Sequence, residues 1–343
     1  MQSVPLRTLG WTLADWQDAY SAGNLSPDYL FELRQQLPAT DPAWITRIST
    51  EQLHARLASL AEQRAAVDGD LSKLPLYGVP FAIKDNIDAS GWPTTAACAE
   101  FAYVAAEDAT VVARLQAAGA VLLGKTNLDQ FATGLVGPRS PYGEVPNSFD
   151  PAYVSGGSSS GSASVVARGL VAFSLGTDTA GSGRVPAGFN NIVGLKPTKG
   201  WLSTKGLVPA CRTLDCISIF ALTVADAEQV AILAGGFDPQ DAYARRNPAR
   251  APVAIGARPR LAVPDVLEFF GDQANEAVFQ RSLQRLTELG AELVPMGSAV
   301  LPIWPRPALT PLPTLLTALF TLPRMPPAGW ATPLRGVPLV AVP

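Results

Sequence analysis

The chain has 343 residues, of which 26 are basic and 29 acidic, so its net charge is −3. With 48% hydrophobic and 16% charged residues, it holds enough apolar material for a folded core, which excludes a disordered chain. The near-neutral charge argues against a nucleic-acid-binding surface, and no apolar run of about 18 residues predicts a membrane span. The three cysteines are too few for a disulfide framework, and the N-terminus lacks a signal-peptide pattern, so we expect a cytoplasmic protein.

The chain contains a single histidine, His54, which falls within a helix predicted at residues 50–67. We interpret it as a helix residue without a catalytic role. A single histidine also argues against a His-rich metal site. The cysteines Cys98, Cys211 and Cys216 lack the spacing of metal ligands, so we expect neither a metal nor a cofactor.

Helical and apolar segments alternate along the chain. Two short helices within residues 9–36 and the helix at 50–67 come first. Apolar strands are then predicted at residues 79–83, 120–123, 172–175, 219–222 and 260–263. Further helices are predicted at 110–118, 127–133, 163–168, 225–234 and 273–289. This alternation predicts an α/β fold with a sheet covered by helices on both faces.

Two short motifs suggest functions that their context excludes. Residues 119–126 fit the phosphate-loop pattern GxxxxGK[ST], but the four middle residues are Ala-Val-Leu-Leu, which predict a buried strand rather than a loop. Residues 157–161 fit the GxSxG nucleophile elbow of α/β-hydrolases. That site needs a histidine after the serine in the chain, and none follows His54.

A serine-rich site without histidine requires another base, and a neutral lysine is the obvious substitute. Lys84 ends the apolar strand at 79–83, so its amine is expected in the crevice at the strand end. The alternative is a lysine whose amine reaches solvent. The Gly-rich turn at 176–183 also follows a strand, and it ends near Ser182. Such a turn either presents backbone N–H groups to an oxyanion or is a plain loop.

Four segments in this order resemble the amidase signature family. They are residues 78–87, 124–132, 156–163 and 176–187, and the similarity continues through 193–198. The resemblance extends over about residues 10–292. It implies the amidase signature fold, in which a mixed central β-sheet is covered by helices on both faces.

The resemblance further implies a Ser-cisSer-Lys triad. By position, Ser182 is the nucleophile, Ser158 is the bridging serine that follows a cis peptide bond, and Lys84 is the base. The implied reaction is acyl transfer, in which neutral Lys84 draws a proton from Ser182 through Ser158. An acyl-enzyme forms on Ser182, ammonia leaves, and water completes the hydrolysis.

The nucleophile loop supplies the remaining site residues that the resemblance implies. The oxyanion is held by backbone N–H groups, those of Thr179, Ala180 and Gly181. Asp178 and Arg184 order the loop rather than react.

Within the family, the resemblance is nearest to the allophanate hydrolases, on residues 130–137, 140–143, 187–191 and 208–216. It implies a small linear amide as substrate, with allophanate (urea-1-carboxylate) first, and a functional link to urea carboxylase. Members of the family are often homodimers. The alternatives are a glutamyl-tRNA amidotransferase A subunit, whose nucleophile loop is typically closer to TDTGGSIRQP, a general amidase, or an inactive gene product.

The composition changes after Glu292, the last acidic residue. Residues 293–343 contain no Asp, Glu or Lys and hold 12 of the 31 prolines. They also lack a YxGPWVAER-like segment, whose tyrosine and arginine recognise the substrate carboxylate in allophanate hydrolases. We therefore expect an amidase signature domain at 1–292, with N-terminal helices at 1–68 and an incomplete catalytic core at 69–292.

The segment 293–343 is then an aberrant tail, for which we consider an out-of-frame translation product. The alternative is a Pro-rich linker or a lineage-specific ending. If the C-terminal part of the core is missing, activity is impaired, because the substrate carboxylate has no arginine partner.

Overall fold

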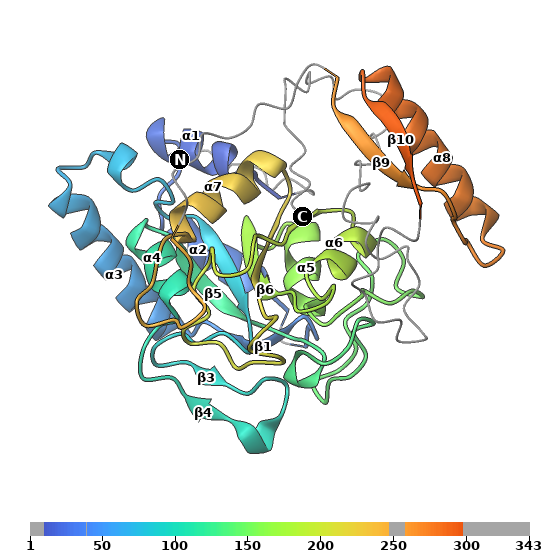
Figure 1. Cartoon of the computed structure of the whole chain (residues 1–343). Coiled ribbons are helices and arrows are strands. Elements are labelled where there is room, and N and C mark those ends of the chain that lie inside the picture. Colours follow the sequence, from blue (N-terminus) through green and yellow to red (C-terminus); the bar gives the residue numbers. More distant parts are fainter. Residues whose placement is uncertain (1–9, 39, 247–257, 298–343) are drawn as a thin grey trace. The chain divides into compact units, whose positions relative to one another are not determined.

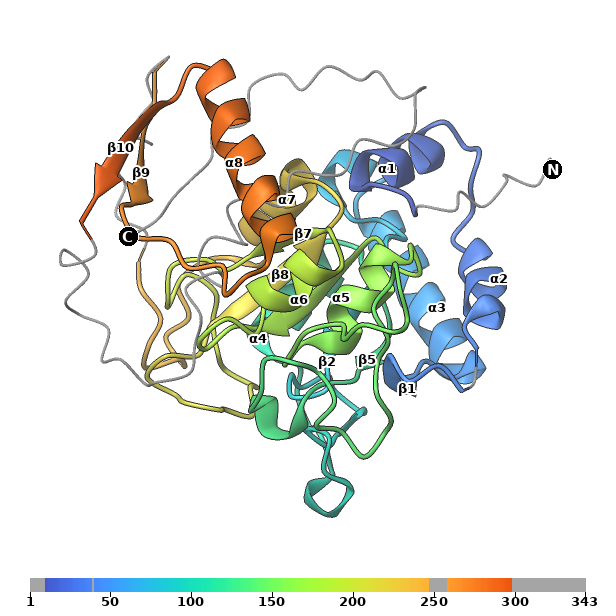
Figure 2. The ribbon, with the colours of Figure 1, turned by 90° about the vertical axis from the view of Figure 1, so that its right-hand side faces the viewer.

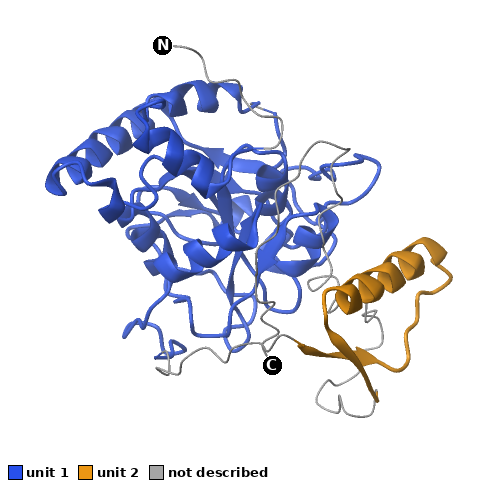
Figure 3. Ribbon diagram, turned by 90° about the horizontal axis from the view of Figure 1, so that it is seen from above, with its two compact units in different colours: residues 1–247 blue, residues 248–343 orange. Residues whose placement is uncertain are grey.

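The computed structural model describes residues 10–38, 40–246 and 258–297 (Figure 1). The chain divides into two compact units, residues 1–247 and 248–343, which are coloured separately in Figure 3. This boundary differs from the division after residue 292 that the composition suggests. The reason is that two strands and a helix beyond residue 258 pack with one another.

A mixed six-stranded sheet forms the centre of the first unit. Its strands are β1 (Trp44–Arg47), β2 (Pro80–Lys84), β5 (Val121–Thr126), β6 (Phe173–Thr177), β7 (Val193–Leu195) and β8 (Ile217–Ala221). The spatial order is β1-β5-β2-β6-β8-β7; β2 is parallel to both β5 and β6, and the other pairings are antiparallel. Every residue of β2, β5, β6 and β8 is buried, which is consistent with their mostly apolar sequences.

Helices cover both faces of this sheet, as the sequence predicts. They are α1 (Leu13–Ser21), α2 (Tyr29–Gln36), α3 (Thr50–Ala66), α4 (Thr110–Ala117), α5 (Ser160–Ala167), α6 (Arg184–Phe189) and α7 (Val224–Ala234). Figure 1 shows α3 and α4 on one side of the sheet, with α5 and α6 on the other, and Figure 2 shows α5 and α6 side by side. Capping boxes begin α1 and α3, at Thr12 and Ser49. Among the described residues, no helix is long and apolar enough to span a membrane.

Several short elements connect the larger ones. They are the antiparallel ribbon of β3 (Pro93–Thr94) and β4 (Tyr103–Val104), and the 3₁₀ turns η1 (Leu71–Lys73), η2 (Ala99–Phe101) and η3 (Gln130–Ala132). The helix predicted at residues 127–133 is wrong, because only η3 forms there. Phe131 and Ala132 adopt φ values of 51° and 55°, in the left-handed region that a right-handed helix cannot contain.

The second unit contains a strand-helix-strand motif. Strand β9 (Arg260–Pro264) pairs in parallel with β10 (Glu292–Met296), and α8 (Gln273–Glu288) connects them. Strand β10 extends across the composition change, because Leu293 pairs with Leu261. The rest of the expected tail, residues 298–343, lies outside the described residues.

Candidate active site

Lys84 and Thr177 are the last residues of the parallel neighbours β2 and β6. Because the carboxyl ends of parallel strands meet at one edge of a sheet, their side chains come together there. Lys84 Nζ donates hydrogen bonds to Ser158 Oγ and to Thr177 Oγ1, both at 2.7 Å. The fold thus joins two of the three predicted triad residues directly. It also adds Thr177, which the sequence did not single out.

Lys84 is completely buried, and burial lowers its pKa to about 7. The carboxylates of three acidic residues act in the opposite direction, those of Asp129, Asp178 and Asp215. Within the described part of the chain, none of them lies close enough to form an ion pair with Nζ. Near neutral pH, a substantial fraction of Lys84 is therefore uncharged and able to accept a proton.

A second buried lysine lies on the next strand. Lys125 of β5 has its Nζ 3.2 Å from Asp85 Oδ1, and neither side chain is exposed. The same Nζ donates to Thr94 Oγ1 at 2.6 Å. Burial lowers the pKa of Lys125 as well, but its ion pair with Asp85 opposes this effect, whereas Lys84 forms no ion pair among the described residues. Of these two lysines, Lys84 is the better base.

Ser158 lies at the start of the segment that leads into α5. The Gly157–Ser158 peptide bond is cis, the form that the resemblance implies. The Ser158 carbonyl accepts a hydrogen bond from the Asp129 N–H at 3.0 Å. The next residue, Ser159, donates its N–H to the Ser182 carbonyl at 3.3 Å, so this segment runs beside the nucleophile loop.

Ser182 lies between β6 and α6 and is almost fully buried. Its Oγ donates a long hydrogen bond of 3.4 Å to the Gly134 carbonyl. Among the described residues, Ser182 Oγ and Ser158 Oγ are not hydrogen-bonded. The structure therefore does not show a direct contact between the two hydroxyl groups. Such catalytic contacts are often long without substrate and tighten when it binds.

One of the three predicted oxyanion donors in the nucleophile loop, residues 176–183, already has a hydrogen-bond acceptor. The Gly181 N–H donates to Asp178 Oδ1 at 2.7 Å, so it is already engaged. This corrects the expectation for Gly181, because a carboxylate accepts the hydrogen that the oxyanion would need. Within the described residues, the N–H groups of Thr179 and Ala180 have no acceptor. These two donors remain for an oxyanion.

Asp178 and Arg184 form a bidentate ion pair across the loop. Arg184 Nε lies 2.9 Å from Asp178 Oδ2, and its Nη2 lies 3.1 Å from Oδ1. Asp178 Oδ2 also accepts the N–H groups of Gly183 and Arg184. Burial opposes ionisation, but these hydrogen bonds and the guanidinium hold the pKa of Asp178 below its usual range. The geometry fits a pair that orders the loop.

Asp215 anchors the same loop from the other side, and the sequence analysis missed it. Its carboxylate accepts hydrogen bonds from Thr179 Oγ1 at 2.5 Å and from the Cys211 N–H at 3.0 Å. Asp215 itself is almost fully buried. The Asp178 carboxylate thus holds backbone N–H groups of the loop, and the Asp215 carboxylate holds the side chain of Thr179.

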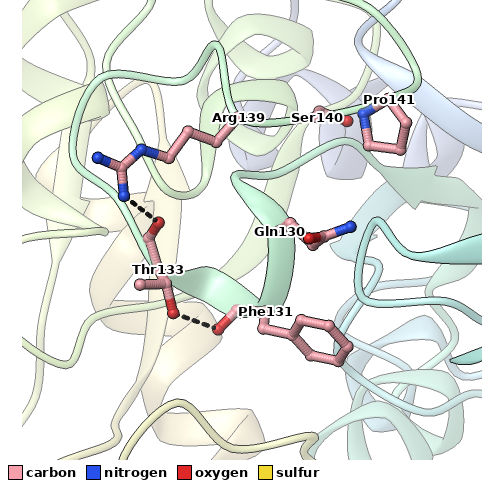
Figure 4. A pocket seen from close by; sticks show the side chains of 6 residues that line it. All are labelled: Gln130, Phe131, Thr133, Arg139, Ser140 and Pro141. Atoms are coloured by element: carbon pink, nitrogen blue, oxygen red, sulfur yellow. Dashed lines mark hydrogen bonds between the residues drawn. The ribbon is translucent and has the colours of Figure 1, made fainter.

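An open pocket of about 500 Å³ borders the loop that contacts Ser182. It is lined by Gln130, Phe131, Thr133, Arg139, Ser140 and Pro141 (Figure 4). Arg139 Nη1 donates to the Thr133 carbonyl at 3.3 Å, and Thr133 precedes Gly134. No predicted triad residue lines this pocket; its lining residue Thr133 precedes Gly134, whose carbonyl accepts the hydrogen bond of Ser182 Oγ.

The sequence analysis gives no catalytic role to His54 or to the cysteines. His54 is on α3, where its ring packs against Phe31 with centroids 4.4 Å apart. All three cysteines are unpaired thiols. No group of three or more His, Cys, Asp or Glu residues within the described ranges is arranged to hold a metal ion.

Comparison with known proteins identifies the class of this fold and site. The model of the family described as Amidase matches residues 37–304. The chain therefore belongs to the amidase family. It is similar to the urea amidolyase of Saccharomyces cerevisiae, with 48% identity over 292 residues, which are 84% of this chain and 16% of that protein. It is 41% identical to the glutamyl-tRNA(Gln) amidotransferase A subunit of Symbiobacterium thermophilum over 280 residues, 79% of this chain and 56% of the relative.

Among solved structures, the Kluyveromyces lactis allophanate hydrolase matches with a TM-score of 0.77 and 46% identity. The match covers 85% of this chain and 48% of the other. The chain thus spans less than two thirds of the length of each of these relatives.

Proposed function

We propose that this chain hydrolyses the C–N bond of a small linear amide, with allophanate as the substrate. The observation that carries the proposal is Lys84, a fully buried lysine without an ion-pair partner among the described residues, whose Nζ lies 2.7 Å from Ser158 Oγ. Its pKa of about 7 is suited to a general base at neutral pH.

The proposed reaction begins with two proton transfers. The neutral amine of Lys84 has a lone pair, so it takes the proton of Ser158 while Ser158 takes that of Ser182. Ser182 Oγ then attacks the amide carbonyl, and the N–H groups of Thr179 and Ala180 donate to the developing oxyanion. The proton returns to the leaving nitrogen, ammonia departs, and water hydrolyses the acyl-enzyme by the same route.

Similarity supports the choice of allophanate. Relatives named urea amidolyase and allophanate hydrolase are 46–48% identical to this chain over about 85% of its length. A functional link to urea carboxylase and assembly as a homodimer are parts of the same proposal. They rest on the resemblance of residues 130–137 and 208–216 to allophanate hydrolases.

The second candidate is an amidotransferase-type or general amidase activity. It is favoured by the 41% identity to a glutamyl-tRNA(Gln) amidotransferase A subunit. The third is a chain without activity, which would follow if the carboxylate-binding tyrosine and arginine are needed.

Ammonia release from allophanate, malonamide and glutamine distinguishes these candidates. Release from allophanate that is lost in Ser182→Ala supports the proposal. Release from glutamine only in the presence of a partner protein supports the amidotransferase, and no Ser182-dependent release supports the inactive chain. Ser164→Ala is the matched control, because Ser164 is a buried serine on α5 and not part of the triad.

A further inference from the structure

Asp129 is a fully buried carboxylate that follows β5. Its Oδ2 accepts the Gly137 N–H at 3.1 Å, and its Oδ1 accepts the Arg139 N–H at 2.9 Å. In the described part of the chain, no cationic side chain forms an ion pair with it. Burying a charge with only backbone donors is expensive, so its presence beside the triad requires an explanation.

Asp129 contacts the segment of Ser158 at two points. Its N–H donates to the Ser158 carbonyl at 3.0 Å. Its Oδ2 packs against Gly157 so closely that a Cβ on Gly157 would collide with it. Asp129 thus fixes the backbone on both sides of the Gly157–Ser158 bond.

The same carboxylate packs against the loop that contacts Ser182. A Cβ on Gly134 would also collide with Asp129 Oδ2, and the Gly134 carbonyl accepts the hydrogen bond of Ser182 Oγ. The Gln130 N–H closes this loop by donating to the Arg139 carbonyl at 2.7 Å. The position of Gly134 therefore depends on Asp129.

Asp129 also acts on Lys84 through its charge. Of the three carboxylates that raise the pKa of Lys84 against the effect of burial, Asp129 has the largest effect, followed by Asp178 and Asp215. Asp178 is neutralised by Arg184. Among the described residues, the Asp129 carboxylate accepts hydrogen bonds from backbone N–H groups and forms no ion pair.

We propose that Asp129 is a positioning residue for the triad, which holds the segment of Ser158 and the loop against Ser182 and places a negative charge beside Lys84. The inference rests on the proposed roles of Lys84, Ser158 and Ser182. It adds a residue that contacts the backbone around both serines and acts electrostatically on the base.

The rate at which a fluorophosphonate probe labels Ser182 tests the inference, because it reports serine reactivity without depending on the substrate. In Asp129→Asn, an amide NH₂ replaces one acceptor and faces a backbone N–H donor, so both the loop and the charge are perturbed. We expect the plateau rate in the full chain to fall about 10- to 100-fold. We also expect the acid limb of the pH profile to move to lower pH, because Lys84 loses a charge that favours its protonated form.

Two further variants separate position from charge. Gly134→Ala displaces the loop and keeps the charge, so it should lower the plateau and leave the acid limb unmoved. Asp226→Asn is the matched control, because Asp226 is also a buried carboxylate that accepts a backbone N–H, that of Leu13, and it is not among the charges that act on Lys84. It should leave both the plateau and the acid limb unchanged.

An unchanged plateau in Asp129→Asn, or a lower plateau with an unmoved acid limb, overturns the inference. If Asp129→Asn does not fold, the test depends on Gly134→Ala. A plateau labelling rate in Gly134→Ala equal to that of the wild type also overturns the inference. Ser182→Ala separates this outcome from the failure of the proposed function. Labelling of wild type that survives Ser182→Ala refutes the triad, whereas Ser182-dependent labelling with normal variants refutes only the role of Asp129.

Discussion

The two buried lysines of the sheet should respond in opposite ways to the same substitution. Lys84 on β2 and Lys125 on β5 are both fully buried, but only Lys125 has a carboxylate partner, Asp85. Methionine is an unbranched side chain of similar length, so it fills either site without a large cavity. We predict that Lys84→Met abolishes activity at little loss of stability, and that Lys125→Met is strongly destabilising.

The magnitude for Lys84 follows from its pKa, which burial lowers from 10.5 to about 7. Between these values the unfolded chain holds the proton and the folded chain does not, so stability rises with pH across this window. At about pH 8, burying Lys84 costs about 3 kcal/mol, at 1.36 kcal/mol per pH unit below 10.5. Methionine removes this cost and forfeits two hydrogen bonds of about 1 kcal/mol each. The net change in unfolding free energy is then within about 2 kcal/mol of zero.

Lys125→Met instead leaves the Asp85 carboxylate buried without its partner. Removing one member of a buried ion pair costs about 3–5 kcal/mol. Denaturant unfolding of both variants and wild type, at about pH 6 and about pH 9, measures the difference and its pH dependence. The reasoning is refuted if Lys84→Met is the less stable variant, or if it retains Ser182 reactivity.

Three further outcomes are expected. First, kcat/KM for amide hydrolysis should rise with pH around an apparent pKa of about 7, because only neutral Lys84 accepts the proton; a profile that is flat across neutrality contradicts this. Second, Arg184→Met should lower the activity and the Tm, because it leaves the Asp178 carboxylate buried without the guanidinium of Arg184; the free energy of unfolding should fall by about 3 kcal/mol. Arg184→Lys should recover part of this loss, and equal losses in the two variants would count against the ion pair. Third, Gly161→Ala should lower Tm more than Gly23→Ala. A Cβ on Gly161 collides with the Ala43 carbonyl and lies 2.6 Å from the Asn127 nitrogen, whereas at Gly23 nothing lies within 4 Å and alanine bears only the strain of a φ of +70°, about 1–2 kcal/mol. Thermal unfolding that shows equal shifts would argue against close packing at α5.

The buried strands β2, β5, β6 and β8 could be predicted from sequence because most of their residues are apolar. Strand β1 could not, because its sequence Trp-Ile-Thr-Arg is short and half polar and its pairing partner, β5, is distant in the chain. Helix α6 was also missed, since it contains Pro186 and Gly188, which disfavour helices. The Asp178 carboxylate stabilises its start by accepting the N–H groups of Gly183 and Arg184. Helix propensity, which depends on local sequence, could not predict this contact from Asp178 in the preceding loop.

The helix expected at 127–133 failed for a related reason. Its sequence is compatible with a helix, but the Phe131 N–H donates to the Ala96 carbonyl at 2.9 Å rather than within a helix. Phe131 and Ala132 adopt left-handed backbone conformations, which bring the chain back towards Asp129. The tertiary contacts of the site thus override the local preference, as is common near functional residues.

The candidate site also combines residues that the sequence could indicate with contacts that it could not. Sequence motifs placed Lys84, Ser158 and Ser182, and the geometry joins the first two. The resemblance implies the Gly181 N–H as an oxyanion donor, but the sequence could not show that the Asp178 carboxylate accepts this N–H. The sequence pointed less clearly to Asp129. Its only trace is the glycines at positions 134 and 157, where the Asp129 carboxylate leaves no room for a Cβ.

The surroundings of the two buried lysines show why a sequence motif must be examined together with its geometry. Asp85 follows Lys84 in the chain, but among the described residues its carboxylate forms no ion pair with the Lys84 amine. Successive side chains of an extended segment point in opposite directions, so the two diverge. The Asp85 carboxylate instead meets Lys125, which pairs with Ile83 across β2 and β5. Asp85 therefore stabilises the charged form of Lys125 rather than that of Lys84. Without an ion-pair partner among the described residues, Lys84 can lose its proton near neutral pH.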